Sequence, residues 1–185
     1  DLQSQYGPGA YLLGPVQLAW IKRELARSSA TWKVIASDTP LGTIAATTPG
    51  ARTPLGRGIE IADLLSFMRR AGIRNTLWLT ADLHYTAAHY FDPNAAVFQD
   101  FEPFWEFVSG PIHAGTFGPN DFDMTFGPEL KFIKAPTAEQ GQNLPPSAGL
   151  QFFGLVDISG ATEQLTVRLM DRDDNELYKV TLDPV

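Results

Sequence analysis

The sequence predicts a mixed α/β fold in which helices cover a sheet and antiparallel strands follow towards the C-terminal end. Three observations support it. Patterns typical of helices and of short buried strands alternate between residues 15 and 81. Apolar and polar residues alternate from residue 150 onward, and hydrophobic residues make up 44% of the 185 residues. That is enough for one ordinary domain with a sizeable core.

The first half of the chain shows a helix–strand–loop–helix–strand order. Residues 15–29 have helical periodicity, because Leu18, Ile21 and Leu25 share one face and Pro15 suits a first turn. Residues 32–36 then predict a buried strand, 38–58 a long loop and 76–81 a second buried strand. A second helix, ending at Gly72, is predicted by apolar residues at i, i+3, i+4 and i+7, namely Ile61, Leu64, Leu65 and Met68.

The second half is richer in turns and strands. Residues 98–126 contain eight aromatic side chains, which either pack in the core or line an apolar substrate pocket. Residues 105–109 predict a strand, and residues 136–146 a polar linker. Asp121 and Asp123 alternate like calcium ligands, but the remaining EF-hand positions are missing, so a solvated loop is the default interpretation. Residues 150–158, 164–170 and 177–182 predict antiparallel strands, with a hairpin turn at 171–175.

Composition excludes several classes of protein. A formal net charge of -7 argues against a nucleic-acid-binding surface, which needs clustered Lys and Arg. The absence of cysteine excludes disulfides, zinc–thiolate sites and a cysteine nucleophile. No apolar run approaches the ~20 residues that span a bilayer. No Gly-x-Ser-x-Gly motif supports a nucleophile-elbow hydrolase.

Acidic residues follow both predicted buried strands. Asp38 comes after the first and Asp82 after the second, so the two carboxylates converge if the strands end together. His84 lies two residues after Asp82, and in an extended chain both side chains point to one side. Oxygen and nitrogen ligands of this kind suit a divalent or ferric metal. The alternatives are that His84 is held by a hydrogen bond at a strand end and that Asp38 caps a turn.

Several peptides in this chain resemble those of alkaline phosphatase D (PhoD)-like enzymes, including the related secreted phospholipase D-type enzymes. They are residues 78–90 (WLTADLHYTAAHY), 101–111 (FEPFWEFVSGP) and 114–119 (AGTFGP), with weaker matches at 17–20, 32–35 and 150–154. The resemblance covers nearly the whole chain in order. It implies part of a calcineurin-like metallophosphoesterase fold, a β-sandwich flanked by helices with two metal ions at the strand ends.

The resemblance also implies roles for particular residues. Asp82 and His84 become catalytic metal ligands, one for each ion, and Asp82 replaces the first histidine of the Gly-His-x-His motif of relatives. Asp38 occupies the place of another metal motif and becomes a third ligand. Independently of the resemblance, His113 lies on a flexible-looking loop from which it is expected to donate to the substrate phosphate, and Tyr85 is likewise assigned to substrate binding. A carboxylate in place of an imidazole favours Fe³⁺ and Ca²⁺ over zinc.

The remaining metal motifs of such enzymes are missing, because the chain contains no Gly-Asp or Gly-Asn dipeptide. Residues 1–185 are therefore interpreted as the C-terminal portion of the phosphatase domain, cut from a longer secreted, periplasmic or cell-surface protein. The N-terminal part of the same protein is the expected partner, and a phosphate mono- or diester is the expected substrate. The alternative is a non-catalytic binding module with an incomplete half-site.

His89 lies five residues after His84 among apolar and aromatic residues. This context favours a packed, hydrogen-bonded core histidine, and the alternative is a role in supporting a metal ligand.

Overall fold

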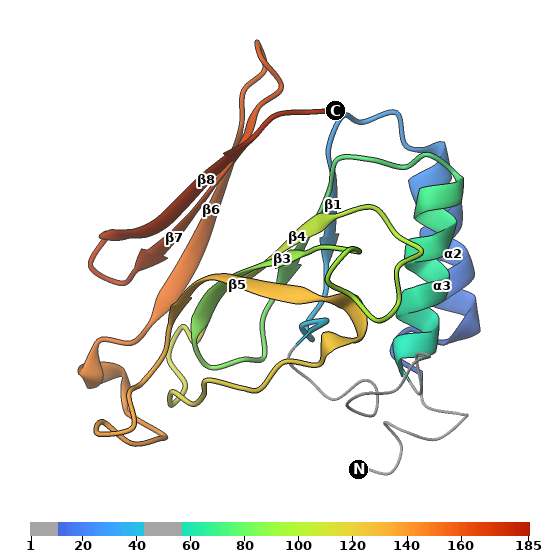
Figure 1. Ribbon diagram of the computed structural model, residues 1–185. Coiled ribbons are helices and arrows are strands. Elements are labelled where there is room, and N and C mark those ends of the chain that lie inside the picture. The colour runs from blue at the N-terminus through green and yellow to red at the C-terminus, as the bar shows by residue number, and fades with distance from the viewer. Residues whose placement is uncertain (1–10, 43–56) are drawn as a thin grey trace.

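The protein has three layers, seen edge-on in Figure 1: two helices, a five-stranded sheet and a three-stranded sheet. The computed structural model describes residues 11–42 and 57–185. The predicted α/β class is confirmed. The start of the chain and most of the long loop predicted at 38–58 lie outside the described residues.

The five-stranded sheet occupies the middle layer, in the order β1-β2-β4-β3-β5. Strands β1, β2 and β4 run parallel, whereas β3 is antiparallel to both of its neighbours, β4 and β5. The carboxyl ends of β1, β2 and β4 therefore lie along one edge. The strands are β1 (Lys33–Ala36), β2 (Thr76–Thr80), β3 (Thr86–Phe91), β4 (Phe104–Val108) and β5 (Pro128–Lys134).

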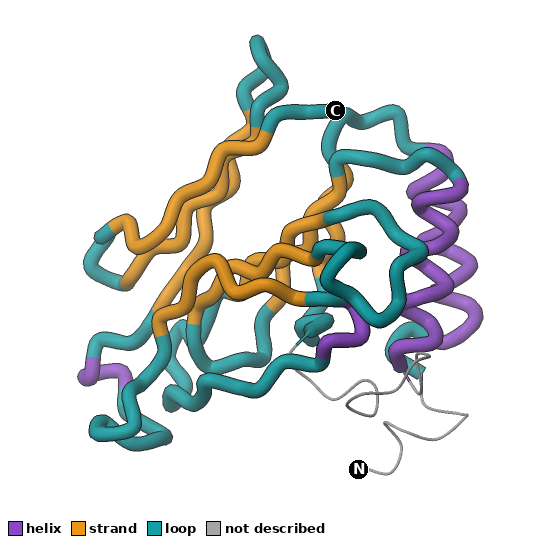
Figure 2. Tube along the Cα trace, viewed as in Figure 1, coloured by secondary structure: helices purple, strands orange, loops and turns teal. Residues whose placement is uncertain are grey.

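Helices α2 (Gly14–Arg27) and α3 (Arg57–Arg70) cover one face of this sheet (Figures 1 and 2). The periodic apolar residues of α3 predicted its buried face correctly, since Ile61, Leu64, Leu65 and Met68 are all buried. The helix stops where predicted. Gly72 has φ of 66°, and the Ile73 amide donates to the Met68 carbonyl at 2.9 Å, which closes the last turn. None of the helices within residues 11–42 and 57–185 could cross a bilayer.

The three-stranded sheet packs on the other face, with the predicted hairpins in place. It contains β6 (Phe152–Ile158), β7 (Leu165–Asp171) and β8 (Glu176–Leu182), paired antiparallel. Because β7 alternates, Leu165, Val167 and Leu169 all point inward and are at most 1% exposed. They form one buried cluster with Leu77 of β2, Ala88 of β3 and Phe107 of β4.

Three features of the fold were not predicted: strand β3, strand β5 and the pairing of residues 136–146 with another part of the chain. β3 and β5 form in segments for which no secondary structure was predicted, and β3 is buried between two neighbours although it is rich in alanine. Residues 136–146 are not a free linker. They turn back along the chain, and Leu144 forms a β-bridge with Thr116 before a short 3-10 helix, η2 (Pro146–Ala148). The pairing partners are distant in sequence, so local patterns carried no signal for them.

The aromatic region contributes mainly to the core. Phe98, Phe101 and Phe126 make mutual ring contacts with centroids 5.9–6.5 Å apart. Asp123 is buried and caps the 3-10 helix η1 (Met124–Phe126), accepting hydrogen bonds from the Thr125 amide at 2.9 Å and its hydroxyl at 2.7 Å. A capping role, and not a solvated loop, therefore accounts for Asp123.

Gly127, which ends η1, is expected to be irreplaceable. It has φ of 60°, and a Cβ there would lie 2.7 Å from both the Ala96 amide nitrogen and the Asp92 carbonyl oxygen. Gly127→Ala should lower the free energy of unfolding by about 2 kcal/mol or more, measured by urea titration. Gly141→Ala is the matched control: its φ is 77°, and nothing lies within 4 Å of the added Cβ. Only backbone strain, about 1 kcal/mol, is expected there, and equal losses would contradict this account.

Candidate active site at the carboxyl ends of the parallel strands

The acidic residues predicted at the strand ends do lie along one edge of the sheet. β1 and β2 are parallel with Ala36 opposite Leu79, and the Ser37 amide continues the pairing by donating to the Leu79 carbonyl at 3.0 Å. Asp38 lies two residues beyond Ala36, and Asp82 lies three residues beyond Leu79, the last pair of this ladder. Both are exposed. The parallel pairing, and not any local contact, brings them to a common edge.

Asp82 sits in an unusual turn. Its φ is 61°, in the left-handed region, and the Leu83 amide donates to the Ala81 carbonyl at 2.6 Å across it. The expectation that the chain stays extended from Asp82 to His84 is therefore wrong. Aspartate tolerates this conformation better than most residues, but it still costs free energy, and such positions cluster at functional sites.

His84 is held in a defined orientation by the segment 115–118. Its Nδ1 is in hydrogen-bond contact with the Gly115 carbonyl oxygen. The Phe117 ring packs edge-on against the imidazole at 5.2 Å between centroids, and the Phe117 amide donates to the His84 carbonyl at 3.3 Å. A carbonyl can only accept, so Nδ1 carries the proton. The lone pair of the neutral ring is therefore on Nε2, the atom available to bind a metal.

The two residues assigned to substrate binding differ in exposure. Tyr85 is 1% exposed and packs with Leu83, Ala87 and Val108, and desolvation by burial raises the pKa of its phenol to about 12. The phenol is therefore neutral at physiological pH. His113 is exposed on the loop after Pro111. Both assignments stay predictions.

The donor set fits part of a metal centre. Two carboxylates and an imidazole are hard or borderline ligands of the kind that iron accepts, and carboxylates suit calcium. In the described parts of the chain, however, no three His, Asp or Glu side chains come together as a metal-binding group. Asp38, Asp82 and His84 share an edge without forming a three-ligand site, so further donors would have to come from elsewhere.

Comparison with known proteins places this chain among phosphatases. The sequence model of the PhoD-like phosphatase family matches residues 1–169. The chain belongs to the PhoD-like phosphatase family. The members of this family are metal-dependent phosphoric ester hydrolases. No curated protein matches the chain.

A solved structure described as "Structure of PhoD" is similar to this PhoD-like chain, with a TM-score of 0.50 and 15% sequence identity. At that identity the likeness concerns the fold alone. The match covers 94% of this chain and 32% of the PhoD chain, so the chain spans about a third of the length of that relative.

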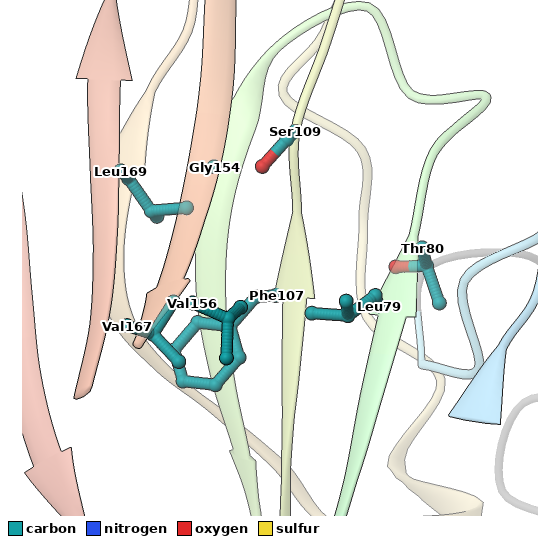
Figure 3. Close-up of a pocket in the computed structure, with 8 residues that line it drawn as sticks. All are labelled: Leu79, Thr80, Phe107, Ser109, Gly154, Val156, Val167 and Leu169. Atoms are coloured by element: carbon teal, nitrogen blue, oxygen red, sulfur yellow. The ribbon is translucent and has the colours of Figure 1, made fainter. Parts of the chain in front are cut away.

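The space between the two sheets of this PhoD-like chain is only partly filled. The sheets are in contact where Phe132 of β5 stacks on Tyr178 of β8 at 5.2 Å, and β1 and β6 are edge strands of their respective sheets. A cavity of about 140 Å³ between the sheets is lined mainly by apolar residues of β2, β4, β6 and β7 (Figure 3). Apolar side chains on the two edge strands remain exposed: Val34 at 44%, Val156 at 36% and Ile158 at 52%.

His89 and Glu106 form a buried pair, of which the sequence predicted only the burial of His89. His89 is a fully buried core histidine, as predicted, and its Nδ1 lies 2.8 Å from Glu106 Oε2. The other oxygen of Glu106 accepts from the Leu41 amide at 2.7 Å, three residues beyond Asp38. Each of the two is the lone His, Asp, Glu, Lys or Arg of a largely apolar strand, TAAHYF or FWEFV. That shared feature could have suggested the pairing.

Proposed function

We propose that this chain supplies the C-terminal half of a two-metal active site that hydrolyses phosphate mono- or diesters. The observation that carries the proposal is the conformation of the Asp82–His84 turn, in which an exposed carboxylate and an imidazole with its Nε2 lone pair available lie at the carboxyl edge of a parallel sheet. This edge is where α/β folds bind their ligands.

The roles of the chain's own residues follow from their positions. Asp82 and His84 each hold one metal ion, and Asp38, brought to the same edge by β1, is a third ligand. His113, exposed on its loop, donates a hydrogen bond to the substrate phosphate. When bound, a pair of metal ions neutralises charge on the phosphoryl oxygens and lowers the pKa of a water molecule.

The choice of metals follows from the ligands. An aspartate in place of a neutral histidine adds negative charge and a hard oxygen, which favours Fe³⁺ and Ca²⁺. Because His84 binds as neutral imidazole with its Nδ1 proton held by a carbonyl, it suits the softer of the two, iron. Family membership further supports an exported enzyme acting outside the cytoplasm.

The active site is completed by the N-terminal part of the protein. Three observations support this proposal: no three-ligand group among the described residues, exposed apolar side chains on both edge strands, and a match to only 32% of the solved PhoD chain. An exposed strand edge with inward-facing apolar residues is normally covered by further chain. Added strands at β1 and β6 would close the space between the sheets.

Completion can be tested by comparing this chain with the same chain joined to its N-terminal part. We expect that only the joined protein binds two metal ions per molecule, measured by elemental analysis, and hydrolyses p-nitrophenyl phosphate or bis(p-nitrophenyl) phosphate. The ratio of the two rates assigns the monoester or diester preference. Full activity of residues 1–185 alone would overturn completion. A folded, joined protein with neither metal nor activity would overturn the enzyme assignment and favour a binding module.

A further inference from the structure

The loop that orients His84 is itself held by a second segment, distant in sequence. Residues 142–144 lie alongside residues 115–118 through four hydrogen bonds. The Gln142 side-chain amide pairs with the Gly118 peptide groups in both directions, accepting from the amide at 2.9 Å and donating to the carbonyl at 3.0 Å. The backbone bonds are Asn143 amide to Thr116 carbonyl at 2.6 Å and Thr116 amide to Leu144 carbonyl at 3.2 Å.

Packing between these two segments leaves little room for movement. A Cβ on Gly115 would lie 2.1 Å from the side-chain oxygen of Asn143 and 3.3 Å from its Cα, so the two segments are in close contact at this point. On the opposite side of the loop, Gly118 has φ of 102°, and a Cβ there would lie 2.4 Å from the Tyr85 ring. Thr116, between the two glycines, is fully buried. The loop thus contacts residues 142–144 on one side and the Tyr85 ring on the other, while the Phe117 side chain is 42% exposed.

We propose that Gln142 is a positioning residue for His84. The chain of contacts runs from the Gln142 amide to the Gly118 peptide and along residues 115–118. It ends at the Gly115 carbonyl, which fixes the Nδ1–H tautomer of His84, and at the Phe117 ring, which fixes its plane. Side chains that orient a ligating histidine in this way tune metal affinity by about 10–100-fold when removed. The inference rests on the proposed role of His84 as a metal ligand.

The local geometry explains why this position requires glutamine. A primary amide carries one acceptor and one donor side by side, so it can bond the N–H and the C=O of Gly118 together. Glutamate keeps the acceptor and loses the donor. Alanine loses both. Gln142 is exposed, so its removal leaves no buried cavity and should change the free energy of unfolding by at most about 1 kcal/mol.

Gln140 provides a matched control. It is an exposed glutamine two residues away, and its side-chain oxygen accepts from the Thr137 amide at 2.9 Å within its own turn. Replacing it by alanine removes another exposed glutamine without releasing residues 115–118. An effect shared by both variants would therefore reflect a general loosening of residues 137–146.

The experiment compares Gln142→Ala, Gln142→Glu and Gln140→Ala in the joined protein, in which this chain is linked to its N-terminal part. ¹⁵N spectra of the metal-free protein, labelled at histidine, report the His84 tautomer, with the signal assigned from its loss in His84→Gln. Zn²⁺ titration reports affinity, since imidazole nitrogen binds zinc. We expect Gln142→Ala to mix the two tautomers of His84 and weaken Zn²⁺ binding about 10-fold. For both the tautomer ratio of His84 and the Zn²⁺ affinity, Gln142→Glu should lie between the wild type and Gln142→Ala. Gln140→Ala should match the wild type in both.

The two readouts separate this inference from the proposed function. A wild-type tautomer and wild-type Zn²⁺ affinity in Gln142→Ala would overturn the positioning role. If His84→Gln binds Zn²⁺ as tightly as the wild type, the ligand role of His84 fails. The tautomer of His84 in Gln142→Ala would still decide whether the glutamine orients the ring.

Discussion

Replacing His84 by alanine in the assembled enzyme should lower turnover by at least about 10³-fold, which corresponds to about 4 kcal/mol of lost transition-state stabilisation. The reason is that its Nε2 is the atom proposed to hold one of two metal ions, and a missing ion removes charge neutralisation at the phosphoryl group. His84 is only partly buried, so folding should be nearly unaffected. Turnover, metal content and the free energy of unfolding are measured together.

Asp82 needs a different substitution, because alanine would add backbone strain at φ of 61°. The substitution Asp82→Asn removes the charge and one carboxylate oxygen without adding backbone strain, since asparagine tolerates the left-handed region as well as aspartate does. This variant should therefore lose activity to a similar extent with no loss of stability. Asp174→Asn is the matched control: Asp174 is exposed, has φ of 63° and lies in the β7–β8 hairpin. Wild-type turnover in both His84→Ala and Asp82→Asn would exclude the metal-site assignment.

The second large effect is expected at Glu106. Its side chain is fully buried and accepts from His89 Nδ1 at 2.8 Å and from the Leu41 amide at 2.7 Å. Glu106→Ala would leave two buried donors without an acceptor and open a cavity. The free energy of unfolding should fall by about 3–5 kcal/mol. Urea titration measures the loss, with the m-value checked for a change in cooperativity.

Glu102→Ala is the control for this substitution. Glu102 lies four residues before Glu106, its side chain is 48% exposed, and its carboxylate is 3.8 Å from Arg69 Nε. An exposed pair of this kind contributes little, so a change within about 0.5 kcal/mol is expected. Similar losses at both positions would show that the buried Glu106 network does not stabilise the fold. Glu106 accepts a hydrogen bond from the Leu41 amide, three residues after the proposed metal ligand Asp38. A stable Glu106 variant should therefore also be assayed for metal affinity.

The elements predicted correctly are those whose signal is local. Helix α3 was specified by its apolar face and by Gly72, and β7 by strict alternation over a buried face. β3 and β5 were missed because their stability comes from partners: β3 lies between β4 and β5, and its two alanines are buried only in that context. Propensity is a weak guide for such a strand.

For the site, the residue types pointed to metal chemistry, but their geometry did not follow from the sequence. The prediction that Asp82 and His84 project together from an extended strand was wrong, because the chain turns at Asp82. The contacts that orient His84 come from Gly115 and Phe117, more than 30 residues away. The holding segment 142–144 had been interpreted as a linker, since a polar stretch gives no local indication of the backbone it pairs with.

The sequence by itself determined the α/β class, the family resemblance and the placement of Asp38 and Asp82 after the first two buried strands, since these depend on local periodicity and on short peptides. The tertiary structure alone decided which nitrogen of His84 is available, that His89 pairs with Glu106, and that apolar side chains stay exposed on the edge strands β1 and β6. Those features depend on hydrogen bonds and packing between segments remote in the chain, and such pairings are fixed only when the whole core assembles.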